Sequence, residues 1–450
     1  MKRHYTLSGL LLCLMTLFTL NASAIRGGDK APDKDYLCFT ANTDGSTVEL
    51  TKSKSPAAVT IQYTTDNGAS WTDVDFSTAT TTGKITLANA GDKVYFRNAS
   101  ADVTGFSTDS RSYYYFVMSG SITASGNVMS LIDKSCQATA ISTDGCFRRL
   151  FYNCEALTSA PELPAKTLFS SCYTQMFYNC SNLTTAPELP ATTLEYSCYN
   201  QMFWGCSSLN DIKIALPAWV PDDNYNRTYY WVKDIKSTGT FSCPEGLDVT
   251  PVGTETFPTG WTAKNTYDLA ITSETGWASM CVNLPLIVPT GVDVYYASAA
   301  SGNTIELTQI EAGTVMAAKT AVIVKGAKGT VSFPIAGEAG TSFTNLFQGS
   351  SVAKACNAGE NYVLNASKST DEKVHFSIYT GTTLSDHKAY LPMSAVGSAS
   401  SIQFRFDGAT AISTVETESS EDVIYNLAGQ RVGSDYHGLV IKNGKKILKR

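Results

Sequence analysis

The chain has 450 residues, of which 43% are hydrophobic and 16% are charged, and its formal net charge at pH 7 is −6. This length and composition predict about three folded domains and exclude a disordered chain, because so many apolar residues can build cores. The mildly acidic balance argues against a nucleic-acid partner.

Residues 1–24 have the pattern of a secretory signal peptide. Lys2 and Arg3 precede an apolar run that ends at Leu20, and the small residues Ala-Ser-Ala follow at 22–24. We expect the mature chain to begin at residue 25, and loss of the two basic residues takes the net charge from −6 to −8. Lipid attachment at Cys13 is an open alternative. No later segment is long and apolar enough to span a membrane.

Residues 25–125 are expected to form an N-terminal β-sandwich. Apolar and polar residues alternate as in half-buried strands, and turn signals such as Asp-Asn-Gly at 66–68 separate the runs. The segment 64–71 resembles the Asp-box hairpin of sialidases, and we interpret its single copy as a hairpin brace. The apolar positions are Val48, Leu50, Val59, Ile61, Tyr63, Ile85, Leu87, Val94 and Phe96.

A 26-residue unit begins at Cys146 and is repeated. The first copies read CFRRLFYNCEALTSAPELPAKTLFSS and CYTQMFYNCSNLTTAPELPATTLEYS, and a third keeps only its first half, CYNQMFWGCSSL. Repetition at this period predicts stacked coils of the leucine-rich-repeat size range, about 20 to 29 residues. We therefore expect residues 126–264 to form a short α/β solenoid, with a C-terminal cap near 219–261.

Each unit is expected to contain one short helix followed by an extended arm. Its apolar positions are four, four and three residues apart, which gathers them in an arc of about 80° on a helical wheel. Pro187 and Pro190 then exclude further helix. The predicted repeat core consists of Cys146, Cys154, Cys172, Met176, Cys180, Leu183, Cys198, Met202, Cys206 and Leu209.

The six repeat cysteines are expected to form two columns of buried thiols. Equivalent side chains in a stack point the same way, whereas a disulfide needs Cβ atoms that face each other. A disulfide framework, common in exported proteins, is the alternative. The C-x7-C spacing without a nearby histidine does not suit zinc, so we expect no metal and no cofactor.

Tyr152, Tyr178 and Trp204 occupy one equivalent position in the three copies. On the helical wheel this position lies nearly opposite the buried arc, so the sequence predicts an outward-facing aromatic row that binds a partner. Bracing of neighbouring coils, or cover by the sandwich, is the alternative role.

Residues 265–412 are expected to form a second β-rich, sandwich-like domain with glycine-rich turns. An acidic linker at 416–422 then separates it from a basic tail, so that residues 413–450 form a linker and a C-terminal unit. The predicted strand positions of the domain are Val292, Val294, Tyr296, Ile305, Leu307, Ala321, Ile323, Val324, Val331, Phe333, Phe404 and Phe406.

The sequence gives little sign of an enzyme. Cys281 could be paired with His375 or with Asp386 and His387 as nucleophile and base, but its neighbours alternate as in a buried strand and no motif would activate the thiol. Carboxylates are scattered and no phosphate-binding loop is present. We expect no catalytic site.

The repeat pattern CYxxMFxxCxxLTxAPELPAxTL resembles that of BspA-type leucine-rich surface proteins of Bacteroidales. The tail, with VIYNLAGQRV at 423–432 and GLVI at 438–441, resembles type IX secretion sorting signals. These resemblances imply a secreted, cell-surface or outer-membrane-associated adhesin whose partners are extracellular proteins, such as host matrix or cell-surface proteins. The alternative is a glycan-binding protein of polysaccharide capture.

Overall fold

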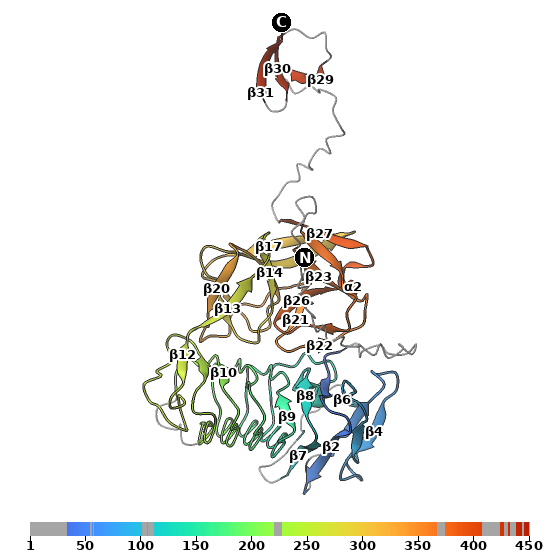
Figure 1. The fold of residues 1–450 in the computed structure, drawn as a ribbon, viewed down its shortest axis with the longest axis vertical. Helices are drawn as coiled ribbons and strands as arrows, with labels where there is room; N and C mark the ends of the chain where they lie inside the picture. Colours follow the sequence, from blue (N-terminus) through green and yellow to red (C-terminus); the bar gives the residue numbers. More distant parts are fainter. Residues whose placement is uncertain are drawn as a thin grey trace, which may run out of the picture. The chain divides into compact units, whose positions relative to one another are not determined.

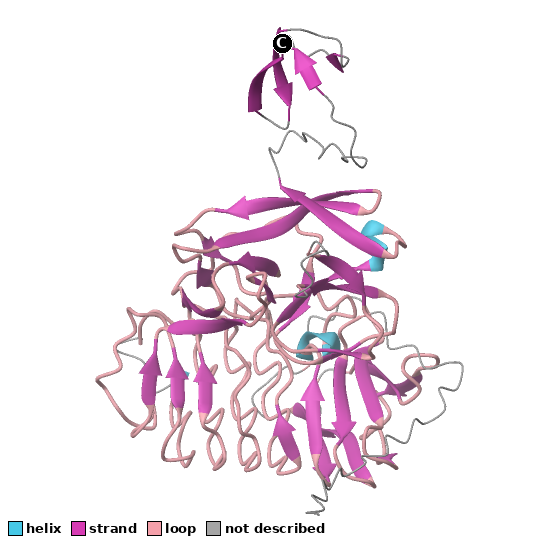
Figure 2. Ribbon diagram, turned by 45° about the horizontal axis from the view of Figure 1, so that its top comes forward, coloured by secondary structure: helices cyan, strands magenta, loops and turns pink. Residues whose placement is uncertain are grey.

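The computed structural model describes residues 34–54, 56, 58–100, 106, 112–219, 227–366 and 374–406, and the backbone of the strands between 424 and 449. The chain is mainly β and divides into two compact units, Met1–Phe404 and Arg405–Arg450 (Figures 1 and 2). The expected signal peptide and acidic linker lie outside the described residues.

Two sheets with a shared core form the N-terminal part of the first unit. Their burial alternates along the strands, as in β2, where Ser46, Val48 and Leu50 are buried. The rings of Phe39 and Phe116, one from each sheet, meet at 4.8 Å. One sheet has the order β4-β3-β6-β1-β8-β9, with β1 Leu37–Ala41, β3 Thr60–Thr64, β4 Thr72–Asp75, β6 Lys93–Asn98, β8 Ile122–Ser125 and β9 Leu157–Ser159; the other has the order β5-β2-β7, with β2 Ser46–Ser53, β5 Ile85–Leu87 and β7 Tyr113–Ser119.

The hairpin between β3 and β4 is braced by Asp66. Its carboxylate accepts hydrogen bonds from the backbone N–H of Ser70 at 3.0 Å and from the hydroxyls of Ser70 and Thr64, both at 2.5 Å. These bonds stabilise the ionised form and lower the pKa of Asp66 to about 2. The expected hairpin brace is therefore present.

The N-terminal sheet that contains β8 continues into the repeat. Strand β8 pairs in parallel with β9, which belongs to the first 26-residue unit, and the 3-10 helix η1 (Val128–Leu131) between them is capped by the side chain of Asn127. One core of buried side chains extends from Leu37 in β1 to Trp261. The repeat thus has no separate core of its own.

The prediction of a helix in each repeat is wrong. Residues 146–206, all of which are described, contain turns and one short strand but no helix. In the second copy of the repeat, alternate N–H groups donate to the carbonyl three residues earlier, as from Met176 to Tyr173 at 3.1 Å. The intervening N–H groups donate to the next coil, as from Phe177 to Met202 at 2.9 Å. The chain is therefore a row of turns that is hydrogen-bonded sideways to the next row (Figure 1).

Left-handed residues at every fourth position explain this geometry. Ser171, Gln175 and Asn179 have φ values of 55°, 56° and 56°. Such a residue ends any α-helical run. In the turn 176–179, Met176 and Phe177 are buried, and Tyr178 and Asn179 are more exposed. The apolar spacing of four therefore reports the turn period, whereas on a helix it would drift by about 40° per step.

The opposite side of the coils carries short parallel strands. Strand β10 (Asp211–Lys213) pairs with β11 (Thr240–Ser242), which pairs with β12 (Thr262–Lys264). An isolated bridge joins Thr185 of the second copy to Asp211. The parallel ladder continues to residue 264, within the segment expected to hold the cap.

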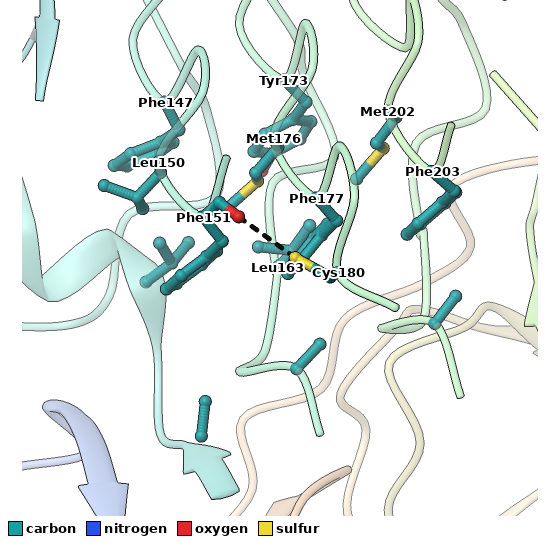
Figure 3. Close-up of a cluster of buried hydrophobic side chains, with 14 of the residues drawn as sticks. Phe147, Leu150, Phe151, Leu163, Tyr173, Met176, Phe177, Cys180, Met202 and Phe203 are labelled. Atoms are coloured by element: carbon teal, nitrogen blue, oxygen red, sulfur yellow. Dashed lines mark hydrogen bonds between the residues drawn. The ribbon is translucent and has the colours of Figure 1, made fainter. Parts of the chain in front are cut away.

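Columns of aromatic rings fill the space between the two sides. Phe116 of β7, Phe151, Phe177 and Phe203 stack at centroid distances of 5.6, 5.2 and 5.7 Å (Figure 3). Because Phe116 comes from β7, the sheet β5-β2-β7 covers the first coil. All ten predicted core residues are buried.

A second β-rich part of the first unit begins at Thr266, and the predicted strand positions lie in or beside its strands. Its largest sheet has nine strands in the order β14-β19-β16-β17-β27-β24-β23-β26-β21. These are β14 Trp277–Met280, β16 Asp293–Ser301, β17 Thr304–Ile310, β19 Val322–Lys325, β21 Gln348–Ser350, β23 Asn361–Asn365, β24 His375–Ile378, β26 Lys388–Pro392 and β27 Ser401–Phe406. The remaining pairs are β13 Thr266–Ile271 with β20 Gly329–Pro334, β15 Leu286–Ile287 with β18 Val315–Met316, and β22 Lys354–Ala355 with β25 Thr383–Leu384; the helix α2 spans Met393–Val396.

The second unit contains a small antiparallel sheet in the order β29-β28-β30-β31. Its strands are β28 Ile424–Asn426, β29 Arg431–Val432, β30 Gly438–Lys442 and β31 Lys445–Lys449. Strands β28 and β29 lie within the sorting-like motif 423–432, and β30 covers the motif 438–441.

Candidate binding surface

Tyr152, Tyr178 and Trp204 lie side by side on the turn side of the coils. The rings of Tyr152 and Tyr178 stack at 4.9 Å with an interplanar angle of 15°, and Trp204 lies 5.4 Å from Tyr178 at 52°. All three are partly exposed. They belong to the outward pair of each four-residue turn, so their position follows from the turn period and not from a helical wheel. We call these three residues the aromatic row.

Lys233 continues the aromatic row into a fourth coil. Gly205 N donates to Lys233 O at 2.9 Å, and Asp234 shares the positive φ of Gly205, which places Lys233 opposite Trp204. The Lys233 ammonium lies 4.2 Å from the Trp204 ring centroid, within cation–π range. The indole N–H of Trp204 donates to Asp234 at 3.0 Å.

Arg149 lies at the other end of the row. Its guanidinium carbon is 5.0 Å from the Tyr152 ring centroid and 5.2 Å from that of Tyr113, and it donates to the Tyr113 hydroxyl at 3.0 Å. Among the described residues, neither Arg149 nor Lys233 forms an ion pair with a carboxylate. The partly exposed aromatic row therefore has a cation at each end.

Polar side chains form rows on both sides of the aromatic row. Arg149 donates to Gln175, which donates to Gln201, and these three side chains follow one line across the coils. On the other side Asn179 donates to Asn153 at 3.1 Å. These bonds between coils hold the aromatic rings in register.

Sequence reasoning found the three aromatic residues but missed the cations. Lys233 lies 29 residues after Trp204, so a three-residue insertion hides its equivalence at the 26-residue period. Part of that insertion lies outside the described residues. Arg149 lies in the first copy, and Gln175 and Gln201 occupy its position in the second and third copies. Only this break in the pattern could have marked Arg149.

The six repeat cysteines stand in two columns beneath this surface and are buried as free thiols. The thiols of Cys154 and Cys206 donate to the carbonyls of Phe116 and Phe177 at 3.2 and 3.0 Å. The thiol of Cys180 donates to the Phe151 carbonyl at 3.1 Å (Figure 3). Burial raises the pKa of the Cys146 and Cys154 thiols to about 12.

The imagined pairing of Cys281 with a histidine is not supported by the geometry. Cys281 is fully buried, and burial raises the pKa of its thiol, which opposes thiolate formation. The contact with His387 uses backbone atoms, with Cys281 N donating to His387 O at 3.1 Å. His375 lies in β24, and His387 instead faces two carboxylates.

No group of three or more potential metal ligands lies together in the described part of the chain. Within the same residues, no helix is long and apolar enough to cross a membrane. No protein-family model matches the chain, and comparisons with curated proteins and with solved structures return no match.

Proposed function

We propose that this chain is a secreted, surface-displayed binding protein whose repeat, residues 146–206, is a short solenoid of the BspA type. Its partner is an extracellular protein of the host matrix, of a host cell or of another bacterium. The observation that carries this proposal is the aromatic row, with Arg149 and Lys233 at its ends. Tyr and Trp are favoured anchors at protein interfaces, and Arg is enriched there.

The charges of the row define the partner further. A surface that complements it has apolar side chains at its centre and carboxylates that reach Arg149 and Lys233 on either side. Both cations lie over aromatic rings, so they are already positioned when the partner arrives. Such pre-organisation reduces the entropy lost on binding.

The same geometry disfavours a glycan at this surface. Aromatic residues that recognise sugars use the open face of a ring, where the negative face of the quadrupole lies. Tyr178 lies between two rings, with Tyr152 stacked on it at 4.9 Å and Trp204 tilted by 52° at 5.4 Å. A row packed in this way suits a protein better than a pyranose ring.

Two parallel measurements test this function on the full-length mature chain. We expect retention on immobilised extracellular-matrix proteins at low ionic strength, weakened by salt because rim charges contribute. A glycan array should show no competable binding. Strong and competable binding to defined sugars, with no retention on matrix proteins, would replace the adhesin by the glycan-binding alternative.

A further inference from the structure

The two APELP segments, 160–164 and 186–190, each bury one glutamate that binds the β-rich part. The Glu162 carboxylate accepts hydrogen bonds from Ser351 N at 2.7 Å and from the Ser350 and Ser351 hydroxyls, both at 2.9 Å, and it forms an ion pair with Lys319. The Glu162 side chain has no exposed surface. One carboxylate of the repeat thus holds two loops of the β-rich part.

Glu188 occupies the equivalent position in the second copy and binds a different set of groups. It accepts from Asn283 N at 2.5 Å, and its Oε1 lies 3.1 Å from His387 Nε2. The Asn283 side chain donates to the backbone carbonyls of Leu163 and Glu188 at 3.1 and 3.3 Å. The repeated glutamate is therefore a docking residue for residues 265–404.

His387 lies between two carboxylates. Its Nε2 faces Glu188 and its Nδ1 lies 3.2 Å from Asp386 Oδ2. A neutral imidazole has one N–H and one lone pair, so one of its nitrogens would face a carboxylate without a proton. Only the imidazolium donates at both nitrogens, and this geometry therefore favours the charged form.

The backbone of His387 is held in place on both sides of its side chain. His387 has a φ of 54°, its N–H donates to Ser350 O at 2.8 Å, and its carbonyl accepts from Cys281 N at 3.1 Å. A non-glycine residue in the left-handed region needs such support from its surroundings. The Cα atom from which the ring projects is therefore held beside the two carboxylates.

Other groups around His387 act on its charge as well. Burial lowers its pKa, but the hydrogen bond to Glu188 and the charges of Glu188 and Asp386 outweigh burial and the nearby charge of Lys213, so the pKa is raised overall. The Tyr267 ring lies 5.7 Å away. A cleft of about 410 Å³ between the repeat and the β-rich part opens beside His387; its lining includes Thr123, Ser159, Thr185, Val352 and Asp386.

We propose that His387 is a protonation-sensitive latch, whose imidazolium holds the β-rich part against Glu188 of the repeat and whose deprotonation loosens that contact beside the cleft. The histidine binds its carboxylates more strongly when charged. Its contribution to stability is therefore complete below the unfolded-state pKa of about 6.5 and is lost as the pH rises through the raised pKa of the folded state.

Amide hydrogen exchange of the whole mature chain tests this latch. The Asn283 and Ser351 amides both cross the contact, the first to Glu188 and the second to Glu162. After correction for intrinsic rates, we expect protection of Asn283 to fall between about pH 6 and about pH 9, the range around histidine titration. Protection of the Ser351 amide should fall less, because its acceptor, the Glu162 carboxylate, is paired with Lys319.

His387→Gln should lower the protection of Asn283 at the acidic pH and abolish its pH dependence. His375→Gln is the matched control and should keep the wild-type response. If His387→Gln does not fold, Glu188→Gln takes its place. This variant keeps a hydrogen-bond acceptor but removes the charge, and it should reduce the pH response. Unchanged wild-type protection across this range, or a full pH response in His387→Gln, would overturn the proposal.

Discussion

At the scale of single residues, the repeat cysteines act as small apolar side chains, and three of them also donate one hydrogen bond. Each thiol of the second column donates to a carbonyl of the preceding coil or, for Cys154, to Phe116 in β7. Serine would be smaller and more strongly polar at the same place, which disfavours its burial in an apolar column. The column therefore needs a residue that is larger and less polar than serine and that can still donate a weak hydrogen bond.

The thiols should be unreactive in the folded chain. Their raised pKa leaves almost no thiolate at pH 8, and burial blocks access, so iodoacetamide should modify none of the six in native protein. After unfolding without a reductant, all six should be alkylated, as mass spectrometry can count. A bridge between Cys146 and Cys172, or between Cys154 and Cys180, would contradict this result.

At the scale of the element, a row of four-residue turns replaces the helix that the spacing predicted. The two differ at Asn179, which is left-handed in the turn and would be right-handed in a helix. Its counterpart in the third copy is Gly205, with a φ of 79°. The third copy therefore already carries the residue that this conformation favours.

Substitution of Asn179 separates the two conformations. In the turn, Asn179→Val should be less stable than Asn179→Gly by about 1–2 kcal/mol, because a β-branched residue is strained at positive φ. Both variants lose the bond to Asn153, so that loss cancels. Urea unfolding gives the difference. A helix predicts the opposite order, since glycine has a lower helix propensity than valine.

The buried positions of the repeat were predictable from its sequence, but the turn was not. Cys172, Met176 and Cys180 are four residues apart, and over so short a stretch a period of four cannot be told from 3.6. Strands such as β2 and β17 were predictable, because alternation over several residues has no helical counterpart. The role of Glu162 and Glu188 was not, since their partners lie about 100 to 200 residues away in sequence.

At the scale of the whole molecule, the chain consists of a large unit and a small one. In the first unit, one extended core joins the two N-terminal sheets to the coils, and the two docking glutamates join the coils to the β-rich part. The second unit has its own four-stranded sheet. Stability and sorting should therefore be separable by truncation.

Deletion of residues 423–450 should leave the melting temperature of the first unit unchanged, because the deletion removes no residue of that unit. If the tail is a sorting signal, the truncated protein should be retained before the cell surface. Calorimetry and cell fractionation give the two results. Normal surface display of the truncated protein would reduce the tail to a structural sheet.

The central claim is that the aromatic row binds an extracellular protein. The most direct measurement uses the matrix proteins on which the wild-type chain is retained. It compares their affinity for the wild-type chain with their affinity for a Tyr178→Ser, Trp204→Ser double variant. We expect a loss of at least about 2 kcal/mol, roughly 30-fold in Kd, because interface anchors carry such energies. Tyr196→Ser, at an exposed tyrosine of the same repeat, is the matched control and should bind as the wild type does. Full affinity of a folded double variant would contradict the claim, as would an equal loss in the control.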